Sequence, residues 1–187
     1  MIEPANDRTA GGCCILIAAA LLIGSLLWMV CIARCHAELP APLEGLLARL
    51  EAPGTPAWKA ALIPRIRERR IGRFMAQVTI YCPNSPADPL GGGAFGAWSF
   101  RGKDIPLRRG HCAVGTTVRA APFGSVLYCP AVVDCLQIVV DKGPGVNGKD
   151  RIDICEPNED RYFALDWANW KRFPCWRLGT VEWEDAR

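Results

Sequence analysis

The sequence has no charged side chain between Arg8 and Arg34, and this gap constrains the chain more than any other feature. Within it, residues 15–32 read ILIAAALLIGSLLWMVCI, an apolar run of 18 residues. A helix needs about 20 such residues to cross a bilayer. A buried core helix is a poor alternative, because nothing nearby is large enough to cover it. The run therefore predicts a single transmembrane or signal helix within residues 1–37.

Two interpretations of this helix remain open. It is either an uncleaved signal anchor or a signal peptide that is cut after Ala37, where Cys35-His36-Ala37 loosely fits the small-x-small cleavage pattern. The run is long for the apolar part of a signal peptide, so its length favours the anchor. In both cases we expect the rest of the chain to lie at the cell envelope, either tethered to the membrane or secreted.

The cysteines of the C-terminal part indicate which side of the membrane it occupies. Counting basic residues on either side of the apolar run slightly favours a cytoplasmic C-terminal part. However, an even set of six cysteines in a small domain is typical of an oxidising compartment and of up to three disulfides. We therefore expect this part outside the cytoplasm. The candidate disulfide cysteines are Cys82, Cys112, Cys129, Cys135, Cys155 and Cys175.

Residues 38–73 are predicted to form a short, basic, helical stalk. Residues 34–73 carry eight basic and four acidic side chains, and helices are expected at residues 43–50 and 58–71. Such a charge run is usually a solvated face, although it could also bind anionic lipid or wall polymer. Residues 74–187 carry thirteen charges of each sign, so the folded part has no net attraction for polyanions and nucleic acid is not an expected partner.

Residues 74–187 have the sequence pattern of a small β domain. Short β-like runs occur at residues 77–81, 125–128, 136–140 and 178–183, separated by Gly and Pro. Only residues 159–170 are suited to a longer helix. Several short strands with frequent turn signals indicate a small barrel or sandwich.

Two aspartates are the best candidates for chemistry. Residues 138–154 read IVVDKGPGVNGKDRIDI, so one short strand ends at Asp141 and the next carries Asp153. Cleavage of a glycosidic bond requires paired carboxyl groups, one as acid and one as base or nucleophile. Burial can raise the pKa of such an acid toward neutral pH. The ordinary alternative is that both aspartates cap turns.

The other motifs carry less weight. No phosphate-binding Gly-x-x-x-x-Gly-Lys-Ser/Thr loop occurs, and the Gly-x-Gly-x-x-Gly string at Gly91, Gly93 and Gly96 is expected to be a loop. His111 is expected to be a hydrogen-bonded structural residue rather than a catalytic one. No Cys-x-x-Cys pair and only two histidines are present, so a zinc site is a weak alternative. We expect no metal and no cofactor.

The stretch from Asp141 to Asp153 resembles the Asp-Thr-Gly-Gly-x-Ile-x-Gly-x-x-Ile-Asp signature of the 3D domain, which is named for three aspartates. It is equally similar to the Asp-Arg-Gly-Pro…Ile-Asp-Leu signature of the rare lipoprotein A group and the expansins. The runs VTIYCP at residues 78–83 and APFGSV at residues 121–126 resemble the opening strand and the Pro-Leu-Gly turn of these families. The resemblance covers residues 74–183 and implies a six-stranded double-psi β-barrel.

The resemblance implies cleavage of peptidoglycan glycan strands by a lytic transglycosylase-like reaction. In this reaction one Asp protonates the glycosidic oxygen and then acts as base on the sugar's own hydroxyl, which closes an anhydro ring. The acid–base role is expected at Asp141 and a supporting role at Asp153. The family's third aspartate is replaced by Thr117, and the lipoprotein A histidine by Val118.

Substrate binding is expected at Trp98, Gly143 and Gly148, with the tryptophan stacking on a sugar face. The other tryptophans considered for this role are Trp167, Trp170, Trp176 and Trp183. The alternative function is an expansin-like module that binds wall polysaccharide without cleaving it. A groove lined by tryptophans would suit either function.

Overall fold

The computed structural model describes residues 23–25, 39–83, 85–86, 88, 93–115, 121–143, 146 and 150–186. The chain divides into two compact units, Met1–Ala41 and Pro42–Arg187. Of the apolar run, only residues 23–25 are described, and they are helical. Within the segments that the structure describes, no helix has both the length and the apolar character needed to span a bilayer. The expected anchor therefore lies largely outside the described residues.

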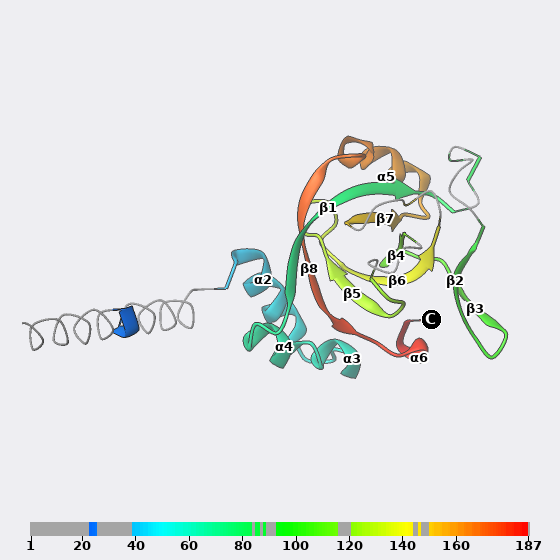
Figure 1. The fold of residues 1–187 in the computed structure, drawn as a ribbon. Coiled ribbons are helices and arrows are strands. Elements are labelled where there is room, and N and C mark those ends of the chain that lie inside the picture. Colours follow the sequence, from blue (N-terminus) through cyan, green and yellow to red (C-terminus); the bar gives the residue numbers. More distant parts are fainter. Residues whose placement is uncertain are drawn as a thin grey trace, which may run out of the picture. The chain divides into compact units, whose positions relative to one another are not determined.

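The second unit is built around a closed barrel of six strands in the order β1-β7-β4-β6-β5-β8 (Figure 1). The strands are β1 (Gly72–Tyr81), β4 (His111–Val114), β5 (Ser125–Tyr128), β6 (Leu136–Lys142), β7 (Arg151–Cys155) and β8 (Arg172–Thr180). β1 pairs with β7 and β4 pairs with β6 in parallel, and the other four pairs are antiparallel. The prediction of a mainly β chain with a small barrel is confirmed.

Alternation along the strands separates the two faces of the barrel wall. Val78 and Ile80 of β1 and Ile152 and Ile154 of β7 pack in the core cluster. Successive side chains of a strand point to opposite faces, so the residues between them face outward. Outward-facing Tyr81 and its neighbours form a second, smaller buried cluster on the other side of the wall. The candidate site lies on this outer side.

Three short helices precede the barrel and belong to the same compact unit. They are α2 (Ala41–Leu50), α3 (Ala57–Ala60) and α4 (Ile63–Arg67). The leucines of α2 are buried, with Leu43 and Leu46 only 1% and 3% exposed. The compact unit therefore starts ahead of residue 74, where the sequence placed the domain boundary. The expected helix at 58–71 is interrupted after Ala60, and Pro64 lies in the first turn of α4, where its missing N–H is tolerated.

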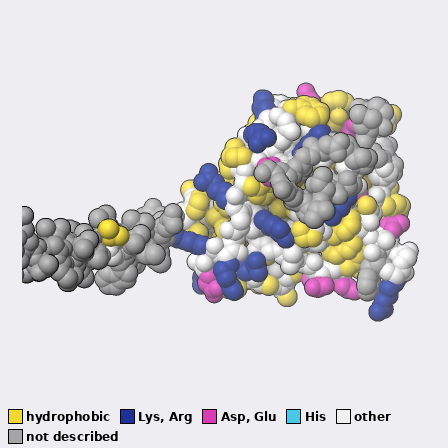
Figure 2. Space-filling view, in the orientation of Figure 1, with side chains coloured by type: hydrophobic (Ala, Val, Ile, Leu, Met, Phe, Trp, Pro, Cys, Tyr) yellow, Lys and Arg dark blue, Asp and Glu magenta, His cyan; other side chains and the backbone are white. Residues whose placement is uncertain are grey.

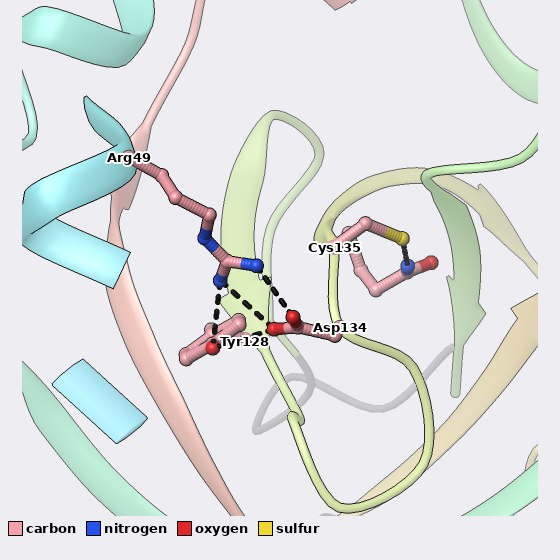
Figure 3. A network of polar contacts seen from close by, with 5 residues as sticks. Arg49, Tyr128, Asp134 and Cys135 are labelled. Atoms are coloured by element: carbon pink, nitrogen blue, oxygen red, sulfur yellow. Dashed lines mark hydrogen bonds and ion pairs between the residues drawn. The ribbon is translucent and has the colours of Figure 1, made fainter. Parts of the chain in front are cut away.

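A polar network joins α2 to the loop between β5 and β6 (Figure 3). The Arg49 guanidinium donates to Asp134 Oδ1 at 2.8 Å and to the Tyr128 hydroxyl at 3.0 Å. The Tyr128 hydroxyl in turn donates to Asp134 Oδ1 at 2.9 Å. The Arg49 guanidinium holds the pKa of the Asp134 carboxyl below its usual value, with help from the Tyr128 hydroxyl. Each of these three residues is therefore hydrogen-bonded to both of the others.

The remaining elements lie around the barrel. They are the hairpin β2 (Phe95–Phe100) and β3 (Lys103–Pro106), helix α5 (Glu159–Ala164), the 3-10 helix η1 (Asp166–Ala168) and helix α6 (Trp183–Ala186). The strand expected at residues 178–183 ends at Thr180, and Trp183 begins α6. Figure 2 shows hydrophobic side chains at the top of the molecule, over α5, and Lys and Arg side chains scattered across the same face.

Candidate functional site

Four strands bring the two predicted aspartates to one level of the barrel wall. Asp153 of β7 pairs with Thr79 of β1 on one side and with Ala113 of β4 on the other. Ala113 also pairs with Asp141 of β6. Residues paired across neighbouring strands project to the same face, and Ala113 belongs to the outer cluster. Because neighbouring strands lie about 4.8 Å apart, the backbones at Asp141 and Asp153 are separated by roughly 10 Å.

Asp153 lies in a poorly solvated position. Burial raises the pKa of its carboxyl from 3.8 to about 6, and the negative charges of Asp88 and Asp141 add to the shift. The Thr79 hydroxyl and the Arg151 guanidinium oppose the shift without cancelling it. Its Oδ1 atom is buried and has no hydrogen-bond partner among the described residues. A carboxyl group in this state exchanges its proton near neutral pH, as general acid–base catalysis requires.

Asp141 is held by the backbone. The N–H groups of Ala97 and Lys142 both donate to its Oδ1 atom, each at 2.9 Å. Ala97 belongs to β2, which packs closely against β6: a Cβ atom at Gly96 would lie 2.6 Å from the Val140 carbonyl oxygen. Only glycine permits this approach. The β2–β3 hairpin therefore supplies one of the two backbone N–H groups that orient the Asp141 carboxyl group.

Trp98 follows Ala97 and lies near Asp141. Its ring stacks on Phe123, with ring centroids 5.8 Å apart and an angle of 2° between the planes. The Lys142 ammonium group is 4.7 Å from the Phe123 ring centroid. The structure thus brings Trp98 and the Lys142 ammonium group to the same aromatic ring, next in sequence to Ala97 and Asp141 respectively. A stacked pair of aromatic rings beside a carboxylate is a suitable platform for a sugar ring.

The two predicted glycines have different outcomes. Gly143 follows β6, and its N–H donates to the Val114 carbonyl oxygen at 3.2 Å. A Cβ atom there would meet nothing within 4 Å, so the space beside it is open. Gly148 and the substituted positions Thr117 and Val118 lie outside the described residues.

The four other tryptophans considered as sugar contacts fall into two groups. Trp176 and Trp183 are buried core residues, whereas Trp167 and Trp170 are 48% and 62% exposed. Trp170 has a φ angle of 67°, a left-handed conformation that a bulky residue rarely adopts. The Arg151 guanidinium carbon lies 4.3 Å from the Trp170 ring centroid. Sequence reasoning missed this pair because the two residues are adjacent only in the folded barrel.

The predicted disulfides are not formed in the structure, where all six candidate cysteines are free thiols. One pair is in contact. A hydrogen bond between the Cys129 and Cys175 thiols lowers the pKa of Cys129 and raises that of Cys175. Cys112 and Cys155 cannot be bridged in this fold, because Cys112 packs in the barrel core and Cys155 in the outer cluster. The even number of cysteines in the sequence did not distinguish these cases.

His111 is a hydrogen-bonded core residue, as the sequence predicted. It is 2% exposed, and its Nε2 atom lies 2.9 Å from the Ala186 carbonyl oxygen. Burial, assisted by the neighbouring Arg108 charge, lowers its pKa to about 4. His111 is therefore neutral at physiological pH. Within the described segments, no group of three His, Cys, Asp or Glu side chains is arranged to hold a metal ion.

Comparison with known proteins provides no assignment at this point. The chain matches no known family model, and no curated protein is similar to it.

Proposed function

We propose that the barrel cleaves the glycan strands of peptidoglycan, with Asp153 and Asp141 as the acting carboxyl groups. One observation carries the proposal: two carboxyl groups from different strands share one outer face of the wall, and burial raises the pKa of one of them to about 6. The parallel pairs β1–β7 and β4–β6 support a double-psi topology for the barrel. The motifs that resemble the 3D and rare lipoprotein A families supply the substrate class.

The burial of Asp153 favours it as the general acid, in place of the Asp141 assignment made from the sequence. In the proposed reaction the protonated Asp153 donates its proton to the glycosidic oxygen, and the bond to the sugar C1 breaks. The Asp141 carboxylate stabilises the positive charge that develops on the ring. Asp153 then accepts the proton of the sugar's own C6 hydroxyl as that oxygen bonds to C1. The product is an anhydro sugar, and water is not consumed.

Trp98 and Trp170 are proposed to hold the sugars on either side of the cleaved bond. Trp98 neighbours Ala97, whose N–H binds Asp141. Trp170 stacks on Arg151, which is two residues from Asp153 and on the same face of β7. Aromatic faces bind the apolar faces of sugar rings with little conformational cost. A glycan strand that runs from Trp170 past Asp153 and Asp141 to Trp98 would contact all four side chains.

The site is proposed to act outside the cytoplasm, because peptidoglycan lies there. Residues 15–32 are proposed to anchor the chain in the membrane or to direct its export. Their sequence supports this assignment, and removing them would test it. A variant lacking residues 1–37 should no longer sediment with membranes. If it still sediments in high salt, the anchor lies elsewhere.

The test of cleavage is to incubate the full-length chain with purified peptidoglycan and to search the products for anhydro ends by mass spectrometry. Asp153→Asn and Asp141→Asn should each lower the rate, whereas the exposed Asp104 of β3 supplies a matched control, Asp104→Asn. Loss of an acid–base group typically lowers a rate by roughly 100- to 10,000-fold. Anhydro products at an unchanged rate from both site variants would contradict the proposal.

The second candidate function is binding without cleavage, as in expansins, and the exposure of Trp167 and Trp170 favours it. In that case the wild-type chain sediments with peptidoglycan and releases no fragments. Substitution of Trp170 by Ala should then reduce sedimentation, and Asp153→Asn should leave it unchanged. This pattern would replace the enzymatic proposal.

A further inference from the structure

A second site lies at the barrel end where β1 and β7 begin. A cavity of about 280 Å³ opens there. Its apolar floor is part of the barrel core: Val114, Leu127 and Ile152 are buried, and the partly buried Phe74 packs against them. Small-molecule sites commonly form at the mouths of β-barrels, where side chains from several strands converge.

Three arginines line the same cavity: Arg73 of β1, Arg151 of β7 and Arg177 of β8. Asp150 is the one acidic side chain among the described residues of its lining, so the site carries a net positive charge. Arg177 pairs with Leu127 across β8 and β5 and so projects to the side of the wall that forms the floor. The cavity thus combines an apolar base with cationic walls.

Aromatic rings hold two of these guanidinium groups. The Arg151 carbon lies 4.3 Å from the Trp170 ring centroid, and the Arg73 carbon lies 5.8 Å from that of Trp176. Stacking on a ring face leaves the N–H groups at the edge of the guanidinium plane free to donate hydrogen bonds. The Arg151 Nε atom is buried and has no hydrogen-bond partner among the described residues. A bound oxyanion would accept a hydrogen bond from the arginine and so supply a missing partner.

We infer that this cavity binds an acidic sugar, with its oxyanion held by Arg73, Arg151 and Arg177 and its ring on the apolar floor. Guanidinium groups bind carboxylate and phosphate in the same forked geometry, so either oxyanion fits the chemistry. The inference rests on the proposed function for the source of the sugar, since a peptidoglycan glycan strand from which the peptide has been removed exposes the lactyl carboxylate of its muramic acid. The binding itself requires no catalysis.

The test is a titration of the full-length chain in detergent micelles with four probes, followed by NMR of the backbone amides. N-acetylmuramic acid carries the carboxylate, and N-acetylglucosamine is the same sugar without its lactyl group. We expect the acid to shift the amides of Ile152 and Arg177 and to bind about tenfold more tightly than the neutral sugar. N-acetylglucosamine 1-phosphate and inorganic phosphate test whether phosphate serves as the oxyanion.

Two variants test whether an arginine that lines the cavity binds the acidic sugar. Arg177→Gln should weaken binding of the acidic sugar about tenfold. Arg172→Gln is the matched control, because Arg172 is exposed on the same strand and does not line the cavity. Binding of the sugar phosphate in place of the carboxylate supports the site and identifies its oxyanion. Equal binding of acidic and neutral sugars, or equal effects of the two arginine variants, would overturn the inference.

The result can be separated from that of the cleavage test. Asp153→Asn should still bind the acidic sugar, because Asp153 does not line the cavity. Binding without any anhydro product from the wild type would contradict the proposed reaction and leave the cavity assignment standing. Anhydro products with no binding of any acidic probe would contradict the cavity assignment alone.

Discussion

Thr79 and Asp153 lie directly opposite each other on the parallel strands β1 and β7, with the carboxyl of Asp153 largely enclosed. This pairing places a titrating group inside the wall of the barrel. The folded state binds the Asp153 proton more tightly than the unfolded state, because burial raises the pKa from 3.8 to about 6. The group therefore contributes to stability at low pH, and this contribution is lost as pH rises from about 4 through 6.

The first prediction concerns the stability of the Asp153→Asn variant, in which the side chain at position 153 cannot ionise. At pH 4 the variant and the wild type should have similar free energies of unfolding. At pH 7.5 the variant should be more stable, by up to about 3 kcal/mol for a pKa difference of this size. Urea denaturation at the two pH values measures the difference. A variant less stable than the wild type at pH 7.5 would show that the ionised carboxylate makes favourable contacts.

The second prediction concerns the pH dependence of glycan cleavage. If Asp153 donates the proton, cleavage should require its protonated form and decline above about pH 6. The rate of release of anhydro ends should be measured from pH 4.5 to 8. A rate that rises steadily across this range would exclude Asp153 as the acid and return the role to Asp141.

The third prediction concerns His111, which titrates in the opposite sense. Burial lowers its pKa to about 4, so it should remain neutral at pH 5. Its neutral form contributes to stability above the ordinary pKa of 6.5, and that contribution falls as pH drops through this value toward 4. The ring resonances of His111 in NMR should not shift between pH 7 and pH 5. A midpoint near 6.5 would place the ring in solvent.

The fourth prediction concerns the Cys129 and Cys175 thiols, which are in contact in the structure. A disulfide-exchange oxidant such as oxidised glutathione should convert the two thiols to one disulfide, releasing two reduced glutathione molecules. Closing a loop of this length stabilises a fold by about 4 kcal/mol in the chain-entropy model. Peptide mapping under non-reducing conditions identifies the bridge. Oxidation that links Cys129 to a different cysteine would contradict the prediction.

The fifth prediction separates the two kinds of contact that hold α2. Leu46 is 3% exposed, and Leu46→Ala should cost about 2–5 kcal/mol. Arg49→Gln breaks the network with Asp134 at an exposed position, so it should cost about 1 kcal/mol or less. Urea denaturation measures both. Equal, negligible effects would mean that α2 contributes nothing to the stability of the barrel unit.

Local signals in the sequence were sufficient for part of the fold. The run at residues 125–128 forms β5 with the expected bounds, and the two aspartates lie on neighbouring parts of one wall. The β2–β3 hairpin could not be predicted, because its glycine-rich start is typical of a loop and it depends on contact between Gly96 and Val140. The burial of Asp153 could not be predicted from the sequence either, because the residues around it come from other strands. The packing of α2 depends in the same way on distant residues.

The closure of the barrel has a consequence for how the chain is made. β1 needs both β7 and β8 as partners, and β8 spans Arg172–Thr180, more than 90 residues after β1. While the ribosome has not yet synthesised β8, one edge of β1 and one edge of β5 have no partner strand. Pairings this distant in sequence form slowly. The growing chain should therefore stay unfolded until β8 has been synthesised.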